Sequence, residues 1–255
     1  MDMLSHLLAD DPASPRLTVY NEADGTRMDF SAQTTENWAS KVANFLREEL
    51  DLDDDSVILC DLPVSWQTAM IALGALAAGV TVRFATDDAI QSAAGTDVIT
   101  GGADVVAGGT GGAGAAAGAE TAASGADEPV VFFTTTDKAD DYTGHGDVVV
   151  VTTDPFGRGV EEIGEQVPEG TIDFGPTVRF YGDFYPGQTQ PLSDLIAPTS
   201  EKLRVLSTGW TDWDSFSRQV LSPLAAGGSA VVVAGMVDTD RLAEIADNEK
   251  ITARD

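Results

Sequence analysis

Apolar residues recur at helical spacing in the segment that follows Ser31. They are Trp38, Val42, Phe45, Leu46 and Leu50. Positions spaced by three or four residues lie on one face of a helix, so this segment predicts a helix with one buried face. Ser31, Thr34 and Thr35 are the candidate N-caps, because a side-chain hydroxyl accepts an amide hydrogen of the first helical turn.

The apolar run 57–62 is short and two-sided, as is typical of a strand buried on both faces of a parallel sheet. Pro63 ends this strand, and Ser65 is placed to cap a second helix, which stops at Gly79 in a left-handed turn. Apolar and polar residues then alternate over 80–84, which predicts another strand. A strand, a helix and a strand in this order favour a right-handed crossover between parallel neighbours.

The same signals predict the remaining elements. Strands are expected at 130–135, 148–152, 177–181, 203–207 and 230–234, with a last strand beginning at Ile251. Helices are expected from Thr211 or Asp212 to Leu224, and from Asp238 or Thr239 onward. With an N-terminal hairpin over 17–31, this order predicts an α/β fold with one mostly parallel, doubly wound sheet and helices on both faces. We expect the hairpin at the edge of that sheet.

The composition narrows the classes of function. The chain has 255 residues, enough for one large α/β domain over 1–255. Its 14 basic and 42 acidic residues give a net charge of −28, which would repel nucleic acid as a partner. The N-terminus carries no signal-peptide pattern, and no apolar run approaches the ~20 residues of a membrane helix.

Cysteine and histidine are scarce, with one and two copies, and the carboxylates show no ligand spacing, so no metal site is predicted. Cys60 lies within an apolar strand and is expected to be a small buried residue. A catalytic thiol would need a neighbouring base. A lone reduced cysteine favours a cytoplasmic protein.

Glycine and alanine dominate 101–127, which is expected to form a flexible insertion. Within it, Gly109, Gly111 and Gly114 fit the G-x-G-x-x-G pattern of dinucleotide-binding loops, and Asp137 follows at the separation expected of a ribose-binding acid. This match leaves open an NAD(P)-dependent oxidoreductase. Against it, a chance match is easy in so glycine-rich a segment, and the helix that would follow has only alanine on its apolar face.

Several motifs resemble those of the adenylate-forming enzymes, which include acyl-CoA synthetases, luciferases and peptide-synthetase adenylation domains. The matching segments are Leu62-Pro63 at the end of a strand, Leu76-Ala-Ala-Gly-Val80 at the end of a helix, the run from Leu221 to Val233, and Ile251-Thr252. The chain most resembles a small actinobacterial group of adenylate-forming-like proteins. This resemblance implies the fold of the N-terminal region of these enzymes, and its motifs specify topology better than chemistry.

The resemblance also indicates where a nucleotide would bind. The loop 183–200 falls at the position of the family's phosphate-binding loop, which makes Gly187, Gln188 and Thr189 the nucleotide-loop candidates. The family's loop ends in a proline and a lysine, and no lysine occurs here. The family's Tyr-Gly-x-Thr-Glu motif for adenine and metal is not found either.

Trp213 and Asp214 are the ligand-pocket candidates, because the equivalent residues of the family open a helix that lines the acyl pocket. Both residues also have simpler interpretations. An aromatic residue at the start of a helix is suited to core packing, and an acid in the first turn interacts favourably with the helix dipole.

These observations leave three hypotheses. We favour a binding or partner module with an adenylate-forming fold, no adenylation of its own, no catalytic residue and no cofactor, because the phosphate loop, the adenine motif and the C-terminal domain with the catalytic lysine are not found. Its ligand would be a small acyl or carboxylate compound, and a second copy or a protein partner would cover any face left open. The alternatives are a divergent acyl-activating enzyme that binds ATP or AMP, and the NAD(P)-dependent oxidoreductase.

Overall fold

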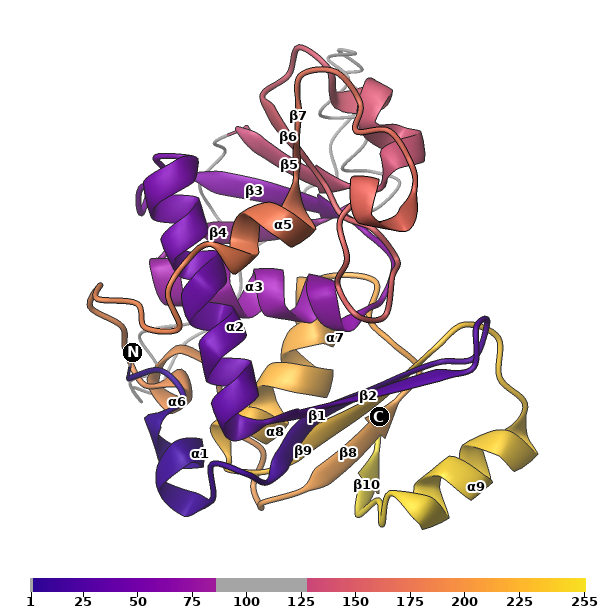
Figure 1. The fold of residues 1–255 in the computed structure, drawn as a ribbon. Coiled ribbons are helices and arrows are strands. Elements are labelled where there is room, and N and C mark those ends of the chain that lie inside the picture. The colour runs from indigo at the N-terminus through magenta and orange to yellow at the C-terminus, as the bar shows by residue number, and fades with distance from the viewer. Residues whose placement is uncertain (1, 86–127) are drawn as a thin grey trace, which may run out of the picture.

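The computed structural model describes residues 2–85 and 128–255, which form two five-stranded sheets with helices packed between them (Figure 1). The first sheet consists of β1 (Pro15–Asn21), β2 (Thr26–Ser31), β8 (Arg204–Ser207), β9 (Ser229–Ala234) and β10 (Ala253–Arg254). Its strand order is β10-β8-β9-β1-β2, and its strands pair in parallel except in the β1–β2 hairpin. The hairpin thus supplies an edge strand, β2, as predicted, whereas β10 begins two residues later than the sequence predicts.

The second sheet consists of β3 (Val57–Asp61), β4 (Thr81–Phe84), β5 (Val131–Thr134), β6 (Asp147–Val150) and β7 (Thr171–Asp173). Its strand order is β4-β3-β5-β6-β7, and its strand pairs are parallel. From β3 the chain first adds β4 on one side, and the later strands are added on the other side. The direction of strand addition therefore reverses between β3 and β5.

The helices fill the space between the sheets and cover the first sheet from outside (Figure 1). They are α1 (Ser5–Asp10), α2 (Ala32–Asn44), α3 (Trp66–Ala78), α5 (Phe174–Arg179), α6 (Leu192–Leu195), α7 (Trp213–Phe216), α8 (Ser222–Ala225) and α9 (Thr239–Asn248). Helix α2 continues as a π-helical turn over Phe45–Glu49, and a similar segment, Ser217–Leu221, joins α7 to α8. Two 3₁₀ helices, η2 (Thr136–Tyr142) and η3 (Glu161–Ile163), lie in the connections of the second sheet.

The predicted ends of the central helices are confirmed. The Ser31 hydroxyl accepts the amide hydrogen of Thr34 at 3.1 Å at the start of α2, and Ser65 accepts that of Thr68 at 3.2 Å at the start of α3. Gly79 ends α3 with a φ of 77°, a left-handed conformation that glycine adopts without strain.

The predicted α/β class, with parallel sheets flanked by helices, is confirmed, but the prediction of one sheet is wrong. Helix α3 gives the physical reason, because all of its residues except Leu76 are buried. A helix that is apolar on all sides needs cover on all sides, and α3 lies between β1 of the first sheet and β4 of the second (Figure 1). One core cluster accordingly joins Val19 and Val232 of the first sheet to Ile58 and Phe133 of the second.

The segment 177–181 lies mostly in helix α5, although its alternation predicts a strand. Phe174 and Val178 are both buried and stand four residues apart, which is the spacing of one helical face. Pro176 occupies the first turn, where its missing amide hydrogen breaks no bond. Phe180, the other apolar residue of the predicted strand, is 90% exposed.

Of the two predicted loop segments, 101–127 and 183–200, the structure describes only the second. The insertion 101–127, with Gly109, Gly111 and Gly114, lies outside the described residues. The loop 183–200 is described, and α6 is its one short helix. In the described ranges, every helix is too short or too polar to cross a lipid bilayer.

Candidate functional site

The nucleotide-loop candidates are held by contacts within the chain. Gly187 packs against the ring of Tyr185 so closely that an added Cβ atom would lie 2.3 Å from the ring carbon Cζ. The Thr189 hydroxyl accepts the amide hydrogen of Asp2 at 2.8 Å, while Gln188 is exposed. Two of the three candidates, Gly187 and Thr189, are therefore already in contact with Tyr185 and with the N-terminal segment, whereas Gln188 is open to solvent.

Trp213 lies in an aromatic cluster beside the end of β4. Its ring stacks on Phe84, with centroids 6.5 Å apart, and contacts Phe216 at 5.9 Å. Trp210 packs on the same Phe216 ring at 4.9 Å. Asp214 is exposed in the first turn of α7, so the structure places the two pocket candidates in different environments. Trp213 is held by neighbouring rings, whereas Asp214 faces solvent.

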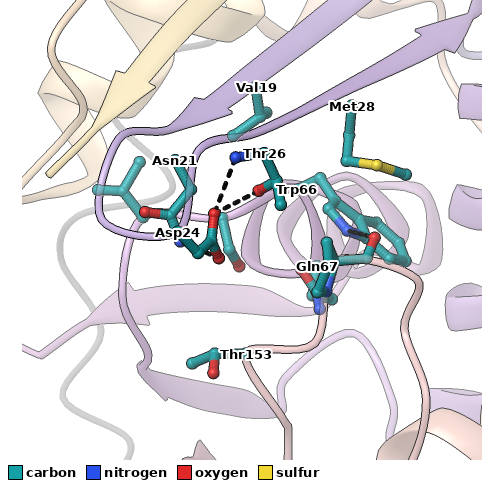
Figure 2. Close-up of a pocket in the computed structure, with 11 residues that line it drawn as sticks. Val19, Asn21, Asp24, Thr26, Met28, Trp66, Gln67 and Thr153 are labelled. Carbon is teal, nitrogen blue, oxygen red and sulfur yellow. Dashed lines mark hydrogen bonds between the residues drawn. The ribbon is translucent and has the colours of Figure 1, made fainter.

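A small pocket lies where the β1–β2 turn meets the start of α3 (Figure 2). Asp24 accepts both the amide and the hydroxyl hydrogen of Thr26 on one side, as the dashed lines show. On the other side, Gln67 donates to the carbonyl of Asp154 at 2.8 Å, and Trp66 donates to that of Pro155 at 3.0 Å. The cavity has a volume of about 30 Å³, which suits a few water molecules and excludes an acyl group or a nucleotide.

Four polar side chains gather at the carboxyl ends of β3 and β5, and we name them the edge cluster: Asp61, Thr134, Lys138 and Tyr142. Asp61 and Thr134 are register partners at the ends of these two strands. The Lys138 ammonium donates to Asp61 Oδ1 at 2.8 Å, and the Tyr142 hydroxyl donates to Asp61 Oδ2 at 3.0 Å. In open parallel sheets, ligands bind outside the carboxyl ends of the strands at the point where strand order reverses, and this cluster occupies that point.

The edge cluster is built by η2, which follows β5 directly and carries Lys138 and Tyr142 back over the outer face of the second sheet. The Tyr142 ring stacks on Phe132 at 4.9 Å, which fixes the direction of its hydroxyl. Burial, and then the adjacent Asp61 carboxylate, raise the pKa of Tyr142 above its usual range. The phenol therefore stays protonated and donates to Asp61.

The sequence predictions missed this cluster, although one signal was present. Asp61 is an acid at the carboxyl end of a buried strand, which is a position typical of binding residues in parallel sheets. Its partners come from a segment more than 70 residues later in the chain. That pairing depends on the strand order, which the local pattern does not contain. Among the described residues, no group of three or more potential metal ligands was found.

The comparisons with known proteins agree with this architecture. A protein of Mycobacterium tuberculosis, described as a TIGR03089 family protein, is 30% identical over 268 residues, which cover 98% of this chain and 95% of the relative. No protein-family model matches the chain.

The solved structures that resemble this chain are larger enzymes. An acyl-CoA synthetase from Brucella canis matches with a TM-score of 0.65 and 15% identity, over 95% of this chain and 44% of the enzyme. A benzoate CoA ligase from Burkholderia xenovorans LB400 matches with a TM-score of 0.61 and 11% identity, over 100% of this chain and 50% of the enzyme. The chain thus spans half or less of the length of these enzymes, and at such identities the likeness shows the fold. The chain belongs to the TIGR03089 protein family, and its fold is that of the acyl-CoA synthetases and CoA ligases.

Proposed function

We propose that this protein is a binding module built on the fold of the adenylate-forming enzymes, without adenylation activity of its own. The observation that supports the proposal is the state of the loop 183–200. Gly187 is packed on Tyr185, Thr189 is bonded to the N-terminal segment, and the loop contains neither lysine nor arginine.

Adenylation requires a site that stabilises the negative charge of ATP during transfer, which proteins provide with amide nests, cations or metal ions. Three of the four lysines of this chain are paired with aspartates. Lys138 pairs with Asp61 and Lys202 with Asp10, both outside the loop, whereas Lys41 pairs with Asp183 at the start of the loop, where the aspartate balances its charge. A net charge of −28 further opposes the approach of a nucleotide triphosphate.

The decisive experiment is ATP–pyrophosphate exchange with the full chain over a panel of aliphatic and aromatic carboxylic acids. We expect no exchange above the background without enzyme. Robust exchange with any acid of the panel would show that the protein adenylates, and the proposal would fail.

The alternative of a divergent nucleotide-binding enzyme is tested separately by thermal unfolding. A ligand that binds the folded state raises the melting temperature by mass action, so ATP or AMP should leave the melting temperature unchanged under our proposal. If either nucleotide raises it, Thr189→Val tests the loop directly. A loop that binds phosphate would lose the shift in this variant, whereas Thr18→Val, in the first sheet, would retain it.

A further inference from the structure

The members of the edge cluster differ in how deeply they are buried. The Lys138 side chain is 44% exposed, the Asp61 side chain is 13% exposed, and Thr134 is fully buried. Lys138 is therefore the outermost of the three, and its ammonium pairs with a carboxylate that is itself largely buried.

The Thr134 hydroxyl has no hydrogen-bond partner among the described residues, although it is fully buried. A buried hydroxyl without a partner is unfavourable, and its presence in a native structure calls for an explanation. Thr134 lies beside Asp61 on the neighbouring strand, and parallel register partners point to the same face of a sheet. A bound group that donates to the Asp61 carboxylate can use the Thr134 hydroxyl as a second acceptor.

The charges around the edge cluster indicate that the bound group is a cation. Helix η2 carries Asp137, Asp140 and Asp141 on either side of Lys138, and the whole chain has a net charge of −28. This field attracts cations and repels anions. Asp61 itself accepts hydrogen bonds through both oxygens, as a carboxylate that holds an ammonium group does.

We propose that Asp61, Thr134 and Tyr142 form a binding site for the primary ammonium group of a small organic amine, and that the Lys138 ammonium competes for the Asp61 carboxylate, leaving Thr134 without a partner, when no ligand is bound. Asp61 pairs with the charge, Thr134 accepts a second N–H bond, and Tyr142 holds the carboxylate in position. The site is separate from the loop 183–200, so the inference stands whether or not the protein adenylates.

The first test is chemical rescue of Lys138→Ala in the full chain. The variant should have a lower melting temperature than the parent, and n-butylammonium chloride should raise it in a saturable way, beyond the effect of equal sodium chloride. Tetramethylammonium, which has no N–H group, should give no rescue. Thr134→Val in the Lys138→Ala background should weaken the rescue, and Asp61→Asn should abolish it.

Lys202→Ala is the matched control, because Lys202 also pairs with an aspartate, Asp10, but on an exposed surface with both side chains about half exposed. It should show no amine-specific rescue. Equal rescue of both variants, or equal rescue by tetramethylammonium, would show that the amine acts only by screening charges as any salt does, and would overturn the proposal.

The second test uses the parent protein, since rescue alone also fits a purely structural ion pair. Titration with n-butylammonium should give saturable shifts of the Asp61, Thr134 and Tyr142 amide signals in ¹H–¹⁵N spectra, with weaker binding than to Lys138→Ala. Acetate should give none at these positions. If the parent shows no saturable shifts while the variant is rescued, Lys138 is a fixed structural partner and the proposal is wrong.

Discussion

Gly74 of α3 faces Val42 of α2 at a distance that leaves no room for a side chain. A Cβ atom added to Gly74 would lie 2.4 Å from Cβ and Cγ1 of Val42 and 2.9 Å from the carbonyl oxygen of Ala39. The two central helices therefore cross in contact at this glycine, and the crossing sets how closely the layers between the sheets can pack.

We predict that Gly74→Ala destabilises the protein by about 1–3 kcal/mol, because overpacking at this crossing outweighs the gain of about 1 kcal/mol in helix propensity. Urea unfolding measures the difference. Gly182→Ala is the control, since the nearest neighbours of its Cβ would lie at 3.8 Å, and it should be close to neutral. The double variant Val42→Gly/Gly74→Ala removes both Val42 atoms from the clash, so its loss should be smaller than the sum of the two single losses; additive effects would argue against the contact.

The stability of the first sheet should depend on pH through Glu249. Burial raises the pKa of this carboxyl, but hydrogen bonds from Tyr20, Arg204 and Arg27 outweigh burial and lower it below the usual 4.5. Because the folded pKa lies below the unfolded one, the stabilisation is complete above about pH 4.5 and is lost as the pH falls through the folded value.

Glu249→Gln should therefore cost about 2–3 kcal/mol at neutral pH, since it leaves the largely buried Arg204 without its carboxylate. The difference between parent and variant should shrink as the pH falls below about 4.5 and through the lower folded pKa. Unfolding free energies across this pH range measure it. A difference that stays constant with pH would show that Glu249 acts through packing alone.

Thr134→Val should stabilise the unliganded protein by about 1 kcal/mol, because it removes a buried hydroxyl that has no partner. Thr18→Val should have the opposite effect. Thr18 is equally buried, but its hydroxyl donates to Asp29 at 2.7 Å and accepts from Arg204 at 3.1 Å. Melting temperatures of the two variants provide the comparison, and a loss of stability in Thr134→Val would mean that its hydroxyl is satisfied in solution.

Alanine substitution of the two pocket candidates of α7 should lower the free energy of unfolding by different amounts. Trp213→Ala should cost about 2–4 kcal/mol, because its half-buried ring stacks on Phe84 and packs on Phe216. Asp214→Ala should cost at most about 0.5 kcal/mol, the value of an exposed acid near a helix N-terminus. Urea unfolding distinguishes them, and equal effects would place Asp214 in an interaction that the structure does not show.

Most helices and strands could be predicted from the sequence because the signals for their ends lie within a few residues of each other. The hydroxyl caps at Ser31 and Ser65, the helix end at Gly79 and the apolar residues 57–60 of β3 each depend on neighbours within a few residues. Helix α5 is not predicted because Val178 and Phe180 alternate with polar residues as in a strand. In the structure, Val178 shares its buried face with Phe174, one helical turn earlier.

The number of sheets and the edge cluster could not be predicted from such local signals. They depend on which strand lies beside which, and β5 pairs with β3 although β4 follows β3 in the chain. The uniform apolarity of α3 is the one feature of the sequence that indicates two sheets, since such a helix needs partners on both sides. The pairing of Asp61 with Lys138 and Tyr142 follows only from the strand order.

Because α3 draws its cover from both sheets, neither sheet retains an intact core when the other opens. Unfolding of the described core should therefore be a single cooperative event, without a stage in which one sheet persists alone. Amide hydrogens of β3 and β9, which belong to different sheets, should exchange with the same opening free energy. In this architecture, one buried helix makes two sheets into one thermodynamic unit.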